Sequence, residues 1–389
     1  MRVIVCPHEL AMGGSQLNAI ELAARLHERG HQVLVFAPEG ELGSKVVELG
    51  LEHVISPTGT RLSMRWIHQL GQLAKSWNAD VVHTYEWAPS LGAACRLVPF
   101  SSAKMVMTVL SMDVPDFIPR QLPLILGTEE LRQSVVTRSG PVYLMEPPID
   151  TTYNSSPQVH ASLKIAREPD ELVLSMVCRI TGELDKAAGV LEAIEAVRQL
   201  EGRYRLKLLV AGDGDAMDQV RQAAEAANSE LGRQAVVLYG NLGDPRAVYA
   251  VSDICLGMGS SAIKALSFGK PLIVQGSGGY WKVFTEGTMD EFLWQGFYGQ
   301  GGLGTAALIQ NLETMCQDTA LRTRLGAWGR EVAVQRFSLQ AAAGNLERIY
   351  LQALESTIEL RVSVLAMARS AYDYMKFIVA TRIRPRLVP

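Results

Sequence analysis

Short apolar runs alternate with amphipathic stretches along most of the chain. The clearest example is residues 172–197, where an apolar run is followed by a polar turn and then by apolar residues at helical spacing. Such runs are typical of strands buried on both faces, and amphipathic stretches are typical of the helices that cover them. The alternation therefore predicts an α/β fold built on doubly wound parallel sheets. The predicted strands are residues 2–7, 31–38, 52–56, 80–84, 104–110, 123–127, 142–144, 172–177, 206–211, 235–239, 253–257 and 271–274.

The strand–helix alternation is interrupted once, and this interruption predicts two domains. Residues 151–169 are polar, lack a regular period and follow a double proline at 147–148, which is typical of a linker. We therefore expect an N-terminal domain at residues 1–155 and a C-terminal domain at residues 170–356. We expect residues 357–389 to form a mostly helical tail. The two halves share an architecture, but no short sequence repeat relates them.

Composition agrees with two large cores and argues against several functional classes. Of the 389 residues 48% are hydrophobic and 20% are charged, and the net charge is −3. General nucleic-acid binders are usually basic, so no nucleic-acid partner is expected. Five scattered cysteines, without a CxxC pair or zinc spacing, predict reduced thiols in a cytoplasmic protein. Neither a signal peptide nor a membrane span is expected.

Two cations stand beside the turn that follows the first strand of the second domain. Arg179 and Lys186 would lie at the carboxyl edge of the sheet, where α/β domains commonly bind anions. A guanidinium fork and an ammonium suit a pyrophosphate, although most Arg and Lys side chains are simply solvated. Gly13 and Gly14 form a second candidate loop, in which a ligand can approach the backbone closely. A dinucleotide is not the expected ligand, because there is no GxGxxG motif and no acidic residue ends the second strand.

Five segments carry motifs that are weak singly but specific in their order and spacing. They are the Gly13–Gly14 loop leading to Arg29-Gly30-His31-Gln32-Val33 (like "rGHeV"), Asp80-Val81-Val82-His83 ("DvvH"), Val177-Cys178-Arg179-Ile180 with Lys186 ("vGRl…K"), Leu209-Val210-Ala211-Gly212-Asp213-Gly214 ("ivGdG") and Ala265-Leu266-Ser267-Phe268-Gly269-Lys270-Pro271 ("EAmaxGxPvi"). Over residues 1–356 the chain thereby resembles the GT-B glycosyltransferases, specifically the retaining nucleotide-sugar enzymes of glycosyltransferase family 4.

The resemblance implies two Rossmann-like domains that face each other across a cleft. The C-terminal domain would bind a nucleotide-sugar donor, with UDP favoured, and the N-terminal domain would bind the acceptor. Arg179 and Lys186 would contact the diphosphate and neutralise the leaving group, without a metal. The implied donor-binding residues are Gly13, Gly14, Arg179, Lys186, Gly212, Asp213, Gly259, Ser260, Ser261 and Lys264. The sequence Asp213-Gly214-Asp215 is similar to a metal-binding DxD motif, but a tight turn after a strand explains it better.

The chain departs from the family at the E-x7-E motif. Leu256 and Lys264 occupy the positions of the two glutamates. A carboxylate accepts hydrogen bonds from ribose hydroxyls, whereas an ammonium only donates, so ribose recognition cannot follow the usual route. Lys264 either contacts a phosphate or an acidic sugar, or it is solvated on a helix face. Ser260 and Ser261 are candidates to bind the donor in place of the first glutamate.

The N-terminal domain also departs from the family, since residues 108–113 lack the usual histidine after a strand. His83 is the remaining candidate catalytic histidine, at a strand end, unless it is a packed or capping residue. Tyr85, Glu86 and Asp113 are, with His83, the candidate acceptor-binding residues. The resemblance implies that the leaving phosphate can take the proton of the acceptor, so an enzymatic base is not required.

Two segments leave alternatives open. Residues 276–304 hold nine glycines and seven aromatic residues, and they either cover a ligand or pack in the core. In the tail, Met367, Ala371, Tyr374 and Phe377 share one helix face. The resemblance favours a tail that packs back on the N-terminal domain, and the alternative is a weak contact between the basic residues 382–386 and an anionic membrane.

These observations predict a retaining glycosyltransferase. It would move a sugar from a UDP-sugar to a hydroxyl or amine of a small-molecule or secondary-metabolite acceptor. One alternative is a non-catalytic relative that acts as an auxiliary protein, which the missing glutamates suggest. Another is a nucleotide-sugar epimerase of the same fold. The donor sugar, the acceptor and the choice between a monomer and a homodimer stay open.

Overall fold

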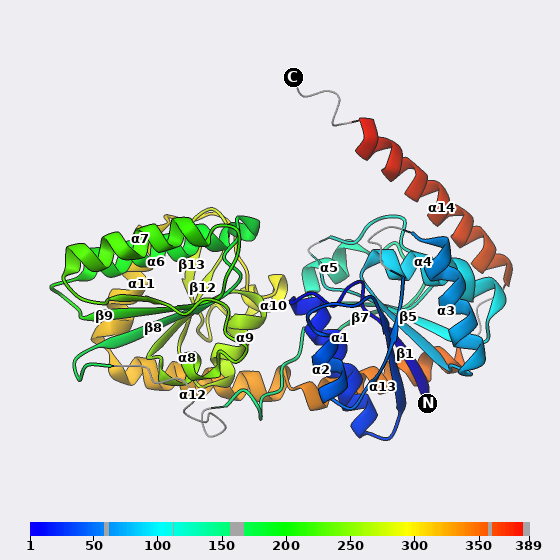
Figure 1. Cartoon of the computed structure of the whole chain (residues 1–389), viewed down its shortest axis with the longest axis horizontal. Coiled ribbons are helices and arrows are strands. Elements are labelled where there is room, and N and C mark those ends of the chain that lie inside the picture. Colours follow the sequence, from blue (N-terminus) through cyan, green and yellow to red (C-terminus); the bar gives the residue numbers. More distant parts are fainter. Residues whose placement is uncertain (58–61, 112, 156–166, 357–359, 384–389) are drawn as a thin grey trace. The chain divides into compact units, whose positions relative to one another are not determined.

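The computed structural model describes residues 1–57, 62–111, 113–155, 167–356 and 360–383. The chain forms two compact α/β units, each built around one sheet (Figure 1). Unit 1 comprises Met1–Pro148 and Leu339–Pro389, and unit 2 comprises Ile149–Ser338. This architecture confirms the predicted fold class of two doubly wound parallel-sheet domains.

The sheet of unit 1 has seven parallel strands in the order β3-β2-β1-β4-β5-β6-β7. The chain adds strands on one side of β1 and then returns to continue on the other side from β4. The switch point, where α/β sheets usually bind ligands, therefore lies at the carboxyl ends of β1 and β4. The strands are β1 (Arg2–Cys6), β2 (Gln32–Ala37), β3 (Glu52–Ile55), β4 (Val81–Tyr85), β5 (Lys104–Val109), β6 (Leu124–Leu126) and β7 (Val142–Leu144).

Helices cover both faces of this sheet, because side chains of its inner strands alternate between two apolar cores. Val3 and Val5 join the core beneath α1 and α13, whereas Ile4 and Cys6 join the core beneath α3 and α4. The helices of unit 1 are α1 (Gly14–Glu28), α2 (Gly43–Glu48), α3 (Met64–Ser76), α4 (Trp87–Phe100), α5 (Glu129–Ser134), α13 (Leu339–Glu355) and α14 (Leu360–Ile383).

Helix α13 corrects the expected domain boundaries at residues 155 and 356. We expected it in the C-terminal domain, but Leu346 and Tyr350 are buried in the core of unit 1. Polar contacts secure it there, since Glu347 accepts a hydrogen bond from Arg29 Nε at 3.0 Å and lies 3.0 Å from His31 Nε2. Arg29 and His31 lie more than three hundred residues earlier in the chain, so the local pattern of α13 does not reveal which core it joins.

The sheet of unit 2 has six strands in the order β10-β9-β8-β11-β12-β13. All pairs are parallel except β12 with β13, and β13 was not predicted. The switch point lies between β8 and β11. The strands are β8 (Leu172–Val177), β9 (Leu206–Ala211), β10 (Val236–Leu238), β11 (Ile254–Gly257), β12 (Leu272–Gln275) and β13 (Trp281–Val283). The helices are η2 (Glu183–Asp185), α6 (Lys186–Leu200), α7 (Met217–Leu231), α8 (Arg246–Val251), α9 (Gly259–Ser267), α10 (Met289–Gln295), α11 (Thr305–Gln317) and α12 (Thr319–Arg336).

Most aromatic residues of the glycine-rich segment 276–304 pack inside unit 2. Trp281, Phe284, Phe292 and Phe297 are all at most 5% exposed, whereas Trp294 is 41% exposed. The two arms of the segment touch, because a Cβ added to Gly276 would lie 2.0 Å from the carbonyl oxygen of Gly299. For these four rings the packing alternative is therefore the correct one.

Candidate active site

Arg179 and Lys186 converge on one carboxylate at the carboxyl end of β8. Arg179 Nη2 lies 3.1 Å, and Lys186 Nζ lies 3.6 Å, from Oε2 of Glu183. The side chain of Arg179 is 56% exposed and that of Glu183 is 59% exposed, whereas Lys186 is only 13% exposed. The two cations thus lie close together beside solvent, and Glu183 occupies a position that suits an anionic ligand.

The turn after β9 supports the loop that carries Arg179. Gly212 has φ +143°, and a Cβ there would lie 1.7 Å from the carbonyl oxygen of Cys178. A Cβ at Gly214 would lie 2.2 Å from the carbonyl oxygen of Ile180, whose amide donates to the carbonyl of Asp213 at 2.9 Å. Glycine is required here because the two backbones touch.

The side chain of Asp213 also shapes this turn. Asp213 Oδ1 accepts the amide of Gly214 at 2.8 Å, as a tight turn requires. Within the described ranges, no group of three or more His, Cys, Asp or Glu residues is placed to hold a metal ion. In this structure Gly212 and Asp213, both expected to bind the donor, shape the loop that presents Arg179.

A second support of the cationic loop is Asp185, which precedes Lys186 and α6. Asp185 adopts a left-handed conformation with φ 54°, as does Leu184. Its Oδ2 accepts the backbone amide of Gly278 at 2.9 Å, and its carbonyl accepts Gln275 Nε2 at 3.0 Å. Asp185 therefore joins the β8–α6 loop to the glycine-rich turn after β12.

The end of β11 forms the other side of the switch point in unit 2. Gly259, with φ +53°, begins α9, and Ser260 lies in its first turn. Ser261 Oγ donates to the carbonyl of Met258 at 2.9 Å, so its hydroxyl is engaged with the helix terminus. Leu256 is 3% exposed within β11 and belongs to the core. No carboxylate takes the place of the first glutamate at that position.

Lys264 lies one turn further along α9, near an ion pair. The pKa of Asp244 is lowered chiefly by side-chain hydrogen bonds from Arg246, and the charge of Lys264 contributes a smaller part. Arg246 also lies over the ring of Tyr153, with 3.6 Å between Cζ and the ring centroid. The site therefore offers a cluster of charged groups at the position where the resemblance implies a ribose-binding glutamate.

Glu86 occupies the switch point of unit 1 in an unusual conformation. Its backbone has φ 68° and ψ 172°, a region that residues other than glycine rarely adopt. The side chain is buried, and it accepts Ser15 Oγ at 2.9 Å, the amide of Leu110 at 3.1 Å and Ser111 Oγ at 2.8 Å. Glu86 thus connects the Gly13–Gly14 loop with the ends of β4 and β5.

The expectation that His83 and Tyr85 contact an acceptor is wrong, because both are 1% exposed. Alternate residues of a strand share a face, and this face of β4 is covered by α13. His83 Nδ1 lies 2.7 Å from Tyr350 Oη, and its Nε2 lies 2.7 Å from Thr108 Oγ1. Burial lowers the pKa of His83 to about 3 and raises that of the Tyr85 phenol.

Among the acceptor-binding candidates, Asp113 is exposed.

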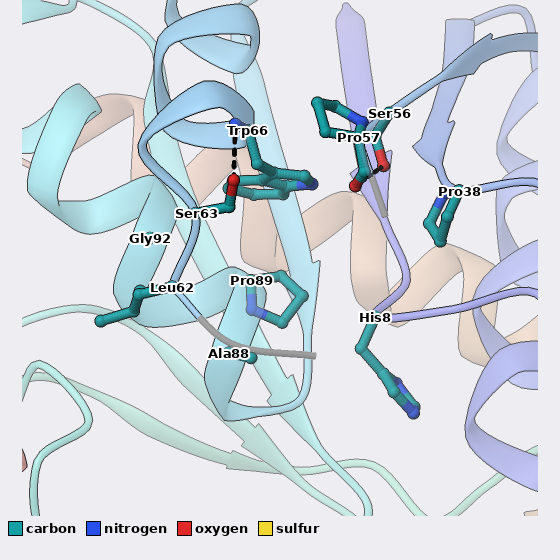
Figure 2. A pocket seen from close by; sticks show the side chains of 10 residues that line it. All are labelled: His8, Pro38, Ser56, Pro57, Leu62, Ser63, Trp66, Ala88, Pro89 and Gly92. Atoms are coloured by element: carbon teal, nitrogen blue, oxygen red, sulfur yellow. Dashed lines mark hydrogen bonds between the residues drawn. The ribbon is translucent and has the colours of Figure 1, made fainter. Parts of the chain in front are cut away.

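Unit 1 also contains a pocket at the carboxyl edge of its sheet, which our reading of the sequence did not identify. It is lined by residues that include His8, Ser56, Pro57, Trp66 and Pro89. Figure 2 shows the ring of Trp66 reaching from α3 toward Ser56 and Pro57. His8 lies two residues after the end of β1, and this position near a strand end could have indicated the pocket from the sequence.

Comparisons with known proteins agree with the two units. A family model described as Glycosyltransferase Family 4 matches residues 12–126. A second, described as Glycosyl transferases group 1, matches residues 168–332. The sequence has no match among the curated proteins with which it was compared.

Several solved structures share the fold at low sequence identity. A glycosyltransferase from Rickettsia africae ESF-5 has a TM-score of 0.72 and 17% identity, over 92% of this chain and 99% of that chain. Anabaena Alr3699/HepE in complex with UDP has a TM-score of 0.69 and 14% identity, over 90% of this chain and 100% of that one. WaaG, a glycosyltransferase involved in lipopolysaccharide biosynthesis, has a TM-score of 0.60 and 15% identity, over 90% and 99%. One family match lies in each unit. The chain therefore belongs to the GT-B glycosyltransferases, with a family 4 N-terminal part and a group 1 C-terminal part.

Proposed function

We propose that the protein transfers a sugar from a UDP-sugar to a hydroxyl or amine of a small-molecule or secondary-metabolite acceptor, with retention of configuration. The observation that carries this proposal is the convergence of Arg179 and Lys186 on Glu183. Two cations that share one carboxylate also suit a diphosphate. UDP is favoured because the similar Anabaena protein was solved with UDP and with UDP-glucose.

The proposed chemistry follows from where charge develops. The bond between the anomeric carbon and the diphosphate oxygen breaks, and its electron pair stays on that oxygen. Arg179 and Lys186 neutralise this charge as it develops, which lowers the barrier to sugar transfer. The acceptor oxygen or nitrogen forms the new bond, and its proton passes to the departing phosphate. The reaction is thereby balanced without a metal and without an enzymatic base, so it does not require the buried His83.

Two further parts of the proposal concern specificity and location. Lys264 places a positive charge where the resemblance implies a glutamate, beside Asp244 and Arg246. This charge favours a donor whose sugar is acidic, such as a UDP-linked acidic sugar. Acceptor binding is assigned to the edge of unit 1 near Glu86 and Asp113. The described cysteines form no disulfide, which favours the cytoplasm as the compartment.

A thermal-shift screen over UDP, UDP-glucose, UDP-N-acetylglucosamine and UDP-glucuronic acid tests donor binding without knowledge of the acceptor. We expect stabilisation by UDP and by at least one UDP-sugar. Donors that bind are then incubated with a panel of acceptors, and the anomeric configuration of each product is read by NMR. Binding without turnover would identify a non-catalytic relative. Conversion of the donor alone into an epimer would identify an epimerase.

A further inference from the structure

Helix α14 is apolar on two opposite faces, and only one of them packs on unit 1. On the inner face, Tyr374 and Phe377 lie against Phe117, with ring centroids 5.3 and 5.2 Å apart, and also contact Trp87. Ser370 on this face is 3% exposed. Figure 1 shows α14 running beside α4, which it contacts. This inner face includes most of the face that the sequence pattern identified.

The outer face carries a second apolar stripe that the sequence pattern did not reveal. Leu365 is 72% exposed, Tyr372 61%, Met375 60% and Val379 51%. Their spacings of seven, three and four residues place all four on one side of the helix, with Ala368 between the first two. Contiguous exposed apolar side chains of this kind mark an interaction surface.

Cations accompany this stripe. Residues 360–389 include six Arg or Lys residues and one Asp, although the whole chain has a net charge of −3. Lys376 Nζ lies 4.7 Å from the centroid of the Tyr372 ring, so this charge sits at the stripe itself. The side chain of Arg369 is 63% exposed, and its Nε lies 3.7 Å from Oδ2 of Asp373.

The charge of the segment indicates whether the outer face binds a second copy of this helix or a lipid surface. A second copy of this helix would bring together two segments that each have a strong excess of positive charge, which is unfavourable. An anionic lipid surface instead complements the cations, and its acyl boundary accepts the apolar stripe. No helix among the described residues is long and apolar enough to span a bilayer.

We propose that α14 binds the surface of an anionic membrane. The stripe formed by Leu365, Tyr372, Met375 and Val379 faces the acyl chains, and Arg369 and Lys376 lie at the lipid phosphates. The inner face stays packed on α4, so α14 attaches unit 1 to the membrane without unfolding. This inference does not depend on the nucleotide-sugar chemistry of unit 2.

Sedimentation of the full-length protein with vesicles tests the proposal. Vesicles of phosphatidylcholine alone are compared with vesicles that contain phosphatidylglycerol in addition. We expect binding to the anionic vesicles only, weakened by salt. The variant Leu365→Ser/Met375→Ser should lower the partition coefficient about tenfold or more, because two exposed anchors are lost. Arg369→Gln/Lys376→Gln should lower it by a similar factor. The matched control Val47→Ser/Val136→Ser replaces two apolar residues that are 66% and 77% exposed elsewhere in unit 1 and should leave binding unchanged.

Three results would overturn the proposal. They are equal binding to neutral and anionic vesicles, no effect of the stripe variant, and a dimer in sedimentation velocity that Leu365→Ser/Met375→Ser dissociates. The last result would show that the stripe joins two copies of the chain. Because all substituted side chains are exposed, the variants should keep the melting temperature of the wild type, and this is measured alongside.

Discussion

Asp185 Oδ2 accepts the backbone amide of Gly278 at 2.9 Å, which joins the loop before Lys186 to the glycine-rich turn after β12. Asp185 also holds a left-handed backbone, with φ 54°. Aspartate and asparagine tolerate this conformation better than alanine does. The donor loop thus depends on one residue for both its backbone shape and its anchoring.

Replacement of Asp185 separates these two contributions. Asp185→Asn keeps the backbone preference but loses the charge on the acceptor, so we expect UDP affinity to fall by about threefold. Asp185→Ala loses both and should reduce affinity by about tenfold. Isothermal titration with UDP measures both variants. Equal affinities for Asp185→Ala and the wild type would show that the anchoring does not position Lys186.

Glu183 occupies both donor cations, so its removal should improve anion binding. In Glu183→Gln the charge that neutralises Arg179 and Lys186 is lost while the shape of the side chain is kept. We expect the Kd for UDP to fall by about threefold, with a stronger dependence on salt. The measurement is isothermal titration at low and moderate ionic strength. Weaker binding by Glu183→Gln would mean that the carboxylate supports the site instead of competing with the ligand.

Glu86 combines a strained backbone with three accepted hydrogen bonds, and two variants distinguish their effects. Glu86→Ala loses the hydrogen bonds and keeps the strain, so unfolding should require about 2 kcal/mol less free energy. Glu86→Gly also loses the bonds but adopts φ 68° readily, and it should be about 1 kcal/mol more stable than Glu86→Ala. Urea unfolding of both variants measures this difference. If glycine were the less stable of the two, the backbone at this position would not be strained.

The buried His83 predicts how the stability of unit 1 depends on pH. Its pKa of about 3 in the folded protein lies well below the value near 6.5 of an unfolded chain, so the unfolded state binds more protons between these limits. Stability should therefore fall as pH decreases from about 6.5 toward 3. In His83→Gln the free energy of unfolding should fall less steeply with decreasing pH, and the slope should correspond to up to one bound proton less. Urea unfolding at pH 4.5, 5.5 and 7 of both proteins tests this. Identical slopes would mean that folding does not lower the pKa of His83.

The sequence predicted the sheet elements and the cationic loop well because these depend on local pattern. The apolar run 172–177 became β8 with the same limits, and Arg179 and Lys186 follow it as expected. The family motifs added the expectation of two Rossmann-like domains, one after the other along the chain.

The errors share one physical cause, since each depends on contacts between distant residues. Whether His83 faces a ligand or the core depends on α13, which arrives more than 250 residues later. The outer stripe of α14 is not evident from the sequence because both faces of that helix are apolar, and contacts with distant residues such as Phe117 show which face is buried. The need for glycine at residue 212 likewise comes from a contact outside its own strand, the approach of Cys178, and its expected contact with the donor stays a prediction.

Isothermal titration of UDP into the wild type, Arg179→Ala, Lys186→Ala and Arg205→Ala tests the central claim most directly. Arg205 is 42% exposed and directly precedes β9, so it lies at the amino edge of the same sheet, away from the donor loops, and serves as the matched control. The account predicts that the wild type binds UDP, that each of the first two variants loses about tenfold or more in affinity, and that Arg205→Ala binds as the wild type does. Absence of UDP binding by the wild type, or equal affinities for all four proteins, would contradict it.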